Sequence, residues 1–283
     1  MQYLLNSLYL NLWAPLLKIP RYFSLAGSFY LKGMKALDRI SLICKEEYTE
    51  QPAYTLGPYF QKWIMAQLPS DSVTVLKHLK KEAFSISALN VGNKIYFSIT
   101  LFTEEASKLI GAILLDSSCQ EIILDMDQER HFIIKSKKIQ YLTTMVLKNI
   151  YYQSDALFPL FILHFRSPTV FDRHGEYVFF PDTQALFQNL MEQYSFILDR
   201  TEQIDGKLLK EICEYTEITT YCVSFTSYLV NNVPIPGFIG EVRINCQGNQ
   251  VLRNYIAMLL LFAEYTGVGI FTDLGMGAVS LEF

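Results

Sequence analysis

The sequence has few charged residues, and its net charge is slightly negative. Only 18% of the 283 residues are charged, and the net charge is −4 at pH 7. A protein that binds nucleic acids with its whole surface is usually basic. The composition therefore argues against a general nucleic-acid binder, and any RNA binding must use local basic patches.

Metal-binding patterns are also missing. The five cysteines form no C-x-x-C pair, and none has a histidine nearby. Asp125 and Asp127 would share one face of a strand, but no other ligand type accompanies them. We expect no metal site and no cofactor. An odd number of dispersed thiols suits a reducing compartment, so we expect the protein to act in the cytoplasm.

A membrane-spanning segment is not expected either. No stretch reaches the roughly eighteen uninterrupted apolar residues that a membrane span needs. Residues 1–17 are apolar in places but lack the basic start of a signal peptide. We expect residues 2–13 to form a buried first strand instead.

The chain is rich in apolar residues, at 51%, and its predicted elements follow the same order in both halves. In the first half, that order comes from a strand at 2–13, a helix from Ser24 towards Lys45, a hairpin at 84–103, a helix at 103–115 and strands at 121–127 and 131–135. In the second half, it comes from a strand at 157–165, helices at 182–198 and 206–214, strands at 218–230 and 238–246, a helix at 249–265 and a strand at 278–283. Strand–helix–strand–strand–helix–strand is the ferredoxin-like unit. We predict an α+β fold of two tandem ferredoxin-like βαββαβ domains, at 1–153 and 154–283, with residues 136–155 as the connection.

Four of the fourteen glycines lie close together near the C-terminus, at positions 267, 269, 275 and 277. Glycine permits positive φ angles and leaves room for backbone N–H groups to approach a phosphate. The simpler alternative is a helix C-cap and a tight loop before a last strand. A dinucleotide-binding fingerprint is excluded because the glycines follow a helix, and a P-loop is excluded because no Lys-Ser/Thr follows them.

This run and two earlier motifs carry a resemblance to a known family. The motifs are Ser167-Pro168-Thr169-Val170-Phe171 with Tyr177 to Pro181, then Pro236-Gly237-Phe238-Ile239-Gly240-Glu241-Val242, then the glycine run. In this order they resemble the C-terminal half of the RAMP superfamily, and within it the CRISPR-associated endoribonuclease that cuts repeat transcripts into guide RNAs. The resemblance covers roughly residues 160–283; in the first half only Tyr54 to Pro58 matches. It implies two ferredoxin-like domains with RNA across their cleft.

The resemblance also implies a chemistry. Family members cut RNA without metal, by attack of a ribose 2′-hydroxyl on the adjacent phosphate, which needs a base, an acid and a cation. A histidine in or after the first helix often takes part. This chain has no histidine between Pro20 and Pro52, and it has Ala26-Gly27 and Cys44-Lys45 where the family often has His-Gly and a second histidine.

Three interpretations of the catalytic site follow. In the first, Lys32 and Lys35 on one face of the helix replace the histidine, with Lys45 and Tyr22 flanking it; a solvated basic face is equally compatible with these lysines. In the second, His78 or His131 enters the site from elsewhere in the first domain. In the third, the site is inactive and the protein only holds RNA, as a subunit of a CRISPR effector complex with other Cas proteins.

For RNA binding we predict the glycine loop and nearby arginines. The loop would contribute Gly267, Gly269, Thr272, Gly275 and Gly277. The family commonly has a lysine or arginine in this loop, whereas this chain has Asp273. Arg243 and Arg253 would then supply the missing positive charge, and Arg166, beside the Ser-Pro-Thr motif, is a further predicted RNA contact. The expected partner is the CRISPR repeat RNA or the guide RNA made from it, with no membrane partner.

Overall fold

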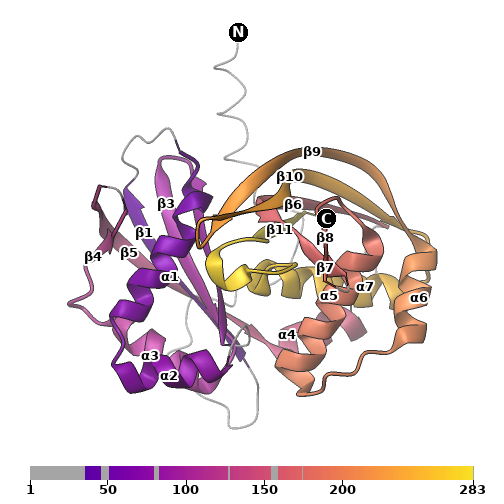
Figure 1. Ribbon diagram of the computed structural model, residues 1–283. Coiled ribbons are helices and arrows are strands. Elements are labelled where there is room, and N and C mark those ends of the chain that lie inside the picture. The colour runs from indigo at the N-terminus through magenta and orange to yellow at the C-terminus, as the bar shows by residue number, and fades with distance from the viewer. Residues whose placement is uncertain are drawn as a thin grey trace. The chain divides into compact units, whose positions relative to one another are not determined.

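The computed structural model describes residues 36–45, 51–79, 83–126, 128–153, 159–173 and 175–282. Each half of the chain forms an antiparallel sheet with helices packed on it (Figure 1). The first half contains β1 (Ala36–Lys45), η1 (Ala53–Leu56), α1 (Gly57–Ala66), α2 (Ser70–Leu79), β2 (Phe84–Val91), β3 (Lys94–Leu101), α3 (Glu104–Leu115), β4 (Glu121–Leu124), β5 (Arg130–Thr143) and α4 (Thr144–Gln153). The second half contains β6 (Leu160–Thr169), β7 (Phe171–Arg173), β8 (Glu176–Val178), α5 (Thr183–Tyr194), η3 (Ser195–Asp199), α6 (Gly206–Tyr215), β9 (Thr216–Val230), β10 (Val233–Cys246), α7 (Gln250–Thr266), η4 (Thr272–Leu274) and β11 (Val279–Glu282).

The two sheets share one strand order, which confirms the predicted pair of ferredoxin-like units. In the first sheet the order is β5-β1-β3-β2, with β4 added beyond β5; in the second it is β11-β6-β10-β9. If the four shared strands of each unit are numbered along the chain, leaving β4, β7 and β8 aside, both sheets have the order fourth, first, third, second. The division between residues 153 and 154 remains a prediction. We note that α4 packs on the second half, since the side-chain amide of Asn254 donates to the carbonyl of Tyr151 over 3.0 Å.

The predicted helix towards Lys45 is wrong over its described part, because residues 36–45 form the central strand β1. The prediction rested on an apolar stripe at Leu37, Ile40 and Ile43. All three side chains are buried, but Ser41 and Cys44 are buried as well. Both faces of β1 are covered, so the alternation that normally identifies a strand is lost. The predicted first strand at 2–13 lies outside the described residues.

Three further predictions for the first half can be compared with the structure. An irregular segment or a short helix is predicted for residues 58–72, and α1 confirms the helix; the mixed structure predicted for 73–81 is wrong over its described part, because residues 73–79 belong to α2. Residues 136–155 were expected to be a connection, but β5 continues to Thr143 and α4 follows at once. Within the described residues, no helix is long and apolar enough to cross a membrane.

A polar network joins the first sheet to the C-terminal end of α7. The Arg39 guanidinium on β1 donates to the carbonyl oxygen of Glu264 and to the Thr100 hydroxyl, and it lies 4.5 Å from the centre of the Tyr265 ring. Ser85 donates to the carbonyl of Tyr265 over 3.1 Å. A cation at a helix C-terminus is favoured by the helix dipole. This junction fixes the point from which the glycine loop leaves α7.

Candidate nucleic-acid interface

The glycine loop, residues 267–277, is packed inside the protein. Its four glycine N–H groups all donate within the chain: Gly267 to the Ala263 carbonyl, Gly269 to the Asn189 side chain, Gly275 to the Thr272 carbonyl and Gly277 to the Pro168 carbonyl. All four glycines and Thr272 are buried. Phosphate contacts through these N–H groups would require the bonds to open. We therefore do not carry this part of the predicted RNA site into our proposal.

The three motifs behind the resemblance form one structural unit around this loop. Ser167 accepts from the Ala278 N–H over 2.9 Å, and the Val170 carbonyl accepts from the Ile270 N–H over 3.0 Å. A Cβ on Gly237 would lie 3.1 Å from the Thr169 backbone. The motifs are therefore explained by packing within the chain, because their residues hold the glycine loop against the second sheet.

The first half meets this unit at the start of α1. The buried Tyr228 hydroxyl donates to the Leu274 carbonyl over 2.6 Å and lies 3.1 Å from the Tyr54 carbonyl. A Cβ on Gly57 would lie 2.6 Å from that hydroxyl and 3.1 Å from the Cα of Gly275. Gly57 is therefore needed for close backbone approach, and it ties η1 and α1 to the glycine loop.

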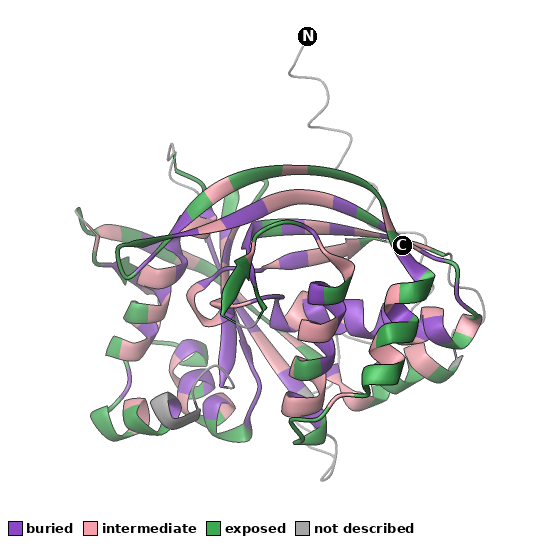
Figure 2. Ribbon diagram, turned by 45° about the vertical axis from the view of Figure 1, so that its right-hand side comes forward, coloured by how far each residue is buried: buried purple, intermediate pink, exposed green. Residues whose placement is uncertain are grey.

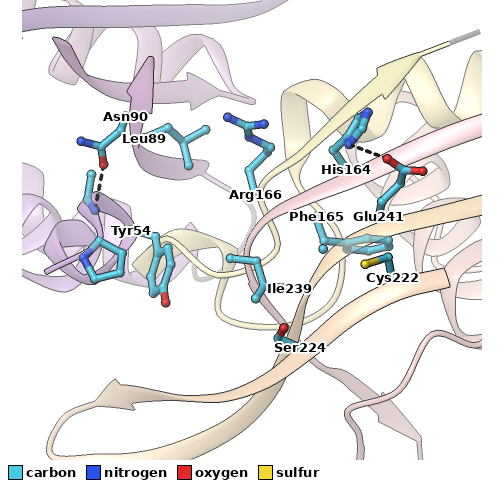
Figure 3. A pocket seen from close by; sticks show the side chains of 13 residues that line it. Tyr54, Leu89, Asn90, His164, Phe165, Arg166, Cys222, Ser224, Ile239 and Glu241 are labelled. Carbon is cyan, nitrogen blue, oxygen red and sulfur yellow. Dashed lines mark hydrogen bonds and ion pairs between the residues drawn. The ribbon is translucent and has the colours of Figure 1, made fainter. Parts of the chain in front are cut away.

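An open pocket of about 510 Å³ lies between the two halves, on one side of η1 (Figure 3). The first half contributes side chains from η1 and the end of β2, and the second half contributes the exposed face of its sheet. Figure 3 shows Arg166 between Leu89 and Asn90 on one side and His164 and Glu241 on the other. The lining residues are Pro52, Ala53, Tyr54, Leu89, Asn90, His164, Phe165, Arg166, Cys222, Ser224, Ile239, Gly240 and Glu241.

The charged side chains in and beside this pocket differ in whether they have an ion-pair partner. His164 lies 3.7 Å from Glu241 and 3.4 Å from Glu282, and Arg243 donates to Glu241 over 2.8 Å. Arg166 is exposed, and among the described residues no hydrogen bond or ion pair reaches its guanidinium. An exposed guanidinium without a partner can bind a phosphate, and the Tyr54 ring in the same pocket offers a surface on which a base can stack.

A larger cleft of about 1240 Å³ lies on the other side of η1. Its walls come from α1, α2, the start of β5, the tip of the β9–β10 hairpin and the glycine loop, and they include Tyr59, Arg130, Asn231 and Asp273. Lys62 in this wall is paired with Asp125 at 2.6 Å. Residues 52–54 border the smaller pocket and residues 51, 55, 58 and 59 border the larger cleft, so the two hollows lie next to the same segment.

The structure places only one of the four predicted catalytic residues. Tyr22, Lys32 and Lys35 lie outside the described residues. Lys45 is the exposed last residue of β1, where it pairs with Lys94. Val91 of β2 also pairs with Lys94, so Lys45 lies at the same end of the sheet as Leu89 and Asn90, which line the pocket.

The residues compared with the family motif are only partly described. The first described helix of the unit is α1, with Leu56 as its N-cap and Gly57 as its first residue, whereas Ala26-Gly27 lie outside the described residues. The histidine that follows is His78, in α2, whose residues Val73 and Leu76 line the larger cleft. His78 therefore remains one of the predicted alternatives for the catalytic role.

The remaining predicted residues are spread over both halves. Arg243 is on the exposed sheet face with Arg166, but Glu241 already holds it. Arg253 is in the first turn of α7, about 20 Å along the helix from Gly267. Its Nε atom is buried and has no hydrogen-bond partner among the described residues. Arg253 is therefore not close enough to supply a cation to the loop. His131, on β5, lies between Glu121 at 2.7 Å and Glu129 at 2.8 Å.

Comparisons with known proteins agree with this architecture. A family model described as CRISPR-associated endoribonuclease Cas6 matches residues 163–279. The Streptococcus thermophilus CRISPR-associated endoribonuclease Cas6 is 30% identical over 233 residues, which is 82% of this chain and 94% of that protein. The Mycobacterium tuberculosis protein of the same description is 28% identical over 239 residues, 81% of this chain and 72% of its own length.

Solved structures show the same fold at lower identity. A Cas6 product complex superposes with a TM-score of 0.69 at 16% identity and covers 88% of this chain and 100% of that one. Thermus thermophilus Cas6 gives a TM-score of 0.62 at 15% identity, with 88% and 99% covered. With the strand order, the joined motifs and the Streptococcus relative matched over nearly its whole length, this chain belongs to the family of CRISPR-associated endoribonucleases Cas6.

Proposed function

We propose that this protein binds CRISPR repeat RNA and cuts precursor transcripts into guide RNAs. The observation that carries the proposal is its identity of 30% to a CRISPR-associated endoribonuclease along 94% of that relative's length. The geometry adds two hollows that both border η1 and an Arg166 guanidinium that is open to an incoming phosphate. RNA would run from the Arg166 pocket past Tyr54 into the larger cleft.

The proposed reaction is an internal transfer at one phosphate. The 2′-oxygen forms a bond to phosphorus as its proton passes to a base, and the bond from phosphorus to the 5′-oxygen breaks as an acid supplies a proton. The products are a 2′,3′-cyclic phosphate and a 5′-hydroxyl. A nearby cation stabilises the charge on the phosphorane. All of these roles can be filled by side chains, so the reaction needs no metal or cofactor.

His78 and the predicted lysines are the groups we propose for this chemistry. An imidazole can act as base or acid near neutral pH, and α2 borders the larger cleft. Lys45 would hold the RNA backbone beside the Arg166 pocket together with Lys94. Lys32, Lys35 and Tyr22 remain alternatives for the catalytic role.

The decisive experiment is incubation of the purified protein with its own locus's repeat RNA in EDTA, with the RNA ends read by mass spectrometry. One cut with a cyclic phosphate and a 5′-hydroxyl supports the nuclease. RNA that is retained but uncut supports the alternative, an inactive subunit that holds the repeat-derived end of the guide RNA. RNA that is neither cut nor bound contradicts both.

Two variants then assign the base. If His78 acts, His78→Ala abolishes cleavage while most RNA affinity is kept, and Lys32→Ala with Lys35→Ala leaves cleavage intact. The opposite result assigns the lysines instead. Assembly with other Cas proteins and a cytoplasmic location are part of the same proposal; co-purification from the host cell would test the assembly, and cell fractionation would test the location.

A further inference from the structure

The edge strand of the second sheet is long and carries few of the residues that protect an edge, although it has a β-bulge at Thr219. β9 runs from Thr216 to Val230 and, among the described residues, pairs only with β10. It contains one charged residue, Glu217, and no lysine, proline or glycine. Natural edge strands usually carry such residues because they prevent pairing with another chain. Figure 2 shows how little of β9 is buried along its length.

An aromatic cluster lies beside this edge. Phe180 has its ring centre 5.3 Å from that of Tyr221 and 6.1 Å from that of Phe225, and Phe179 is 6.4 Å from Phe225. The four residues remain 44% to 58% exposed. Tyr221 and Phe225 alternate with Cys222 and Ser224, so the rings lie on the opposite face of β9 from the Arg166 pocket.

The exposed area is large enough to matter. A large aromatic side chain presents about 200 Å², so four half-exposed rings offer about 400 Å² per molecule. Two copies meeting through this cluster would bury about 800 Å² from rings alone, and the paired strand edges would add to it. A specific interface needs about 1,000 Å² in total. The patch therefore has the size that a second copy of this chain would cover.

The sequence of β9 is also complementary to itself. In an antiparallel pair with a two-fold axis at Val223, Tyr221 of each copy faces Phe225 of the other. Thr220 then faces Thr226, and Cys222 faces Ser224, so polar residues meet on one face and aromatic rings on the other. The two Glu217 side chains are about 40 Å apart in this register and do not repel each other.

We propose that two copies of this chain pair antiparallel along β9, centred on Val223, and form a two-fold dimer whose two second-half sheets become one. The rings at 179, 180, 221 and 225 of both copies close over the junction. The dimer goes beyond the proposed function, and its experiments contain no RNA, so failure of either one leaves the other untouched.

The first test is sedimentation velocity over a range of concentrations. The wild-type protein is expected at twice 32.6 kDa. Tyr221→Lys with Phe225→Lys should be a monomer, because like charges then face each other, and so should Tyr221→Glu with Phe225→Glu. A mixture of the two variants should recover the dimer. Both pairs change residues that are more than half exposed, so unchanged thermal unfolding should show that the monomers are folded.

The second test fixes the register. Cys222 is exposed and free, and in the proposed pair it faces position 224 of the other copy. Ser224→Cys should therefore form a covalent dimer under mild oxidation, because directly opposed residues lie at disulfide distance. Thr226→Cys is the matched control: it faces Thr220, so it should form far less. A wild-type monomer at all concentrations, open-ended assemblies, or equal cross-linking of the two variants would overturn the proposal.

Discussion

The glycine loop and Arg166 belong to the same half of the molecule and were both predicted to contact RNA, yet the polar groups of the loop point into the protein and the Arg166 side chain is exposed. The loop donates its four glycine N–H groups to carbonyl and side-chain oxygens of its own chain. The pocket leaves the Arg166 guanidinium open and places it between the two halves. The loop is a structural junction, whereas the pocket is a surface that can receive a ligand.

The difference shows what a glycine run means physically. A missing Cβ allows close approach of the backbone, but the sequence does not say what approaches. In this chain the glycines of the loop contact Val268, Pro168 and Gly57, which all belong to the protein itself. The loop therefore supports RNA binding indirectly, since it holds η1 between the two hollows through Gly57 and Tyr228.

The strongest test of the junction is Gly277→Ala. Gly277 has a φ of +71°, and a Cβ there would overlap the carbonyl oxygen of Val268. We expect a loss of roughly 3 kcal/mol or more in the free energy of unfolding, because strain and a backbone clash combine. Gly175→Ala is the control: its φ is +87°, but nothing lies within 4 Å of the added atom. Its cost should be about 1 kcal/mol.

Chemical denaturation of both variants measures the difference. If both variants lose the same free energy of unfolding, the loop moves aside easily and is not a rigid structural junction.

The second test concerns the cation that joins the first sheet to α7. Arg39→Met removes a partly buried guanidinium that contacts the Glu264 carbonyl, Thr100 and the Tyr265 ring. We expect a loss of roughly 2–3 kcal/mol, because buried acceptors lose a charged donor. Arg243→Met is the matched change on the exposed face, where an ion pair is worth at most about 1 kcal/mol. If the two variants unfold alike, Arg39 does not hold the junction.

How accurately the sequence predicts each helix or strand depends on how that element is buried. Helix α7 was predicted closely because its apolar run is too long for a strand. Strands β9 and β10 were predicted closely because their β-type runs are long. β1 was mistaken for a helix because both of its faces are buried. Because of that error, the central strand of the first sheet was missed.

The pocket was beyond prediction for a different reason. Its walls come from residues near 53, 89, 165, 223 and 240, which only the folded sheets bring together. Arg166 was noticed because it adjoins the Ser-Pro-Thr motif, and nothing local marked Tyr54 or Asn90 as its neighbours. Likewise, the internal hydrogen bonds of the glycine loop depend on Asn189 and Pro168, and no spacing rule links those positions.

The pocket itself is tested by Arg166→Ala. We expect about a tenfold loss of RNA affinity, the value of one charge-assisted contact, and a salt dependence reduced by about one phosphate. Stability should change by less than about 0.5 kcal/mol, since the side chain is exposed. Arg243→Ala should lose less affinity, because Glu241 already holds that guanidinium. Salt-dependent binding of repeat RNA measures both, and equal losses would mean that pairing with Glu241 does not matter for RNA.

The smallest expected effect is a pH dependence at the junction. Burial raises the pKa of the Glu264 carboxyl above its ordinary value of 4.5, although it accepts from the Leu281 N–H and lies near Arg39. The folded state then holds this proton more tightly than the unfolded state, so its contribution is fully present below about pH 4.5 and is lost as the pH rises through the folded pKa. Glu264→Gln keeps the acceptor oxygen and removes the titration.

We therefore expect the variant to match the wild type in acid and to become relatively more stable towards neutral pH, as measured by urea unfolding at several pH values. A wild type that gains on the variant as the pH rises would mean that attraction to Arg39 outweighs burial, and the junction would then be held by an ion pair rather than by packing and backbone hydrogen bonds.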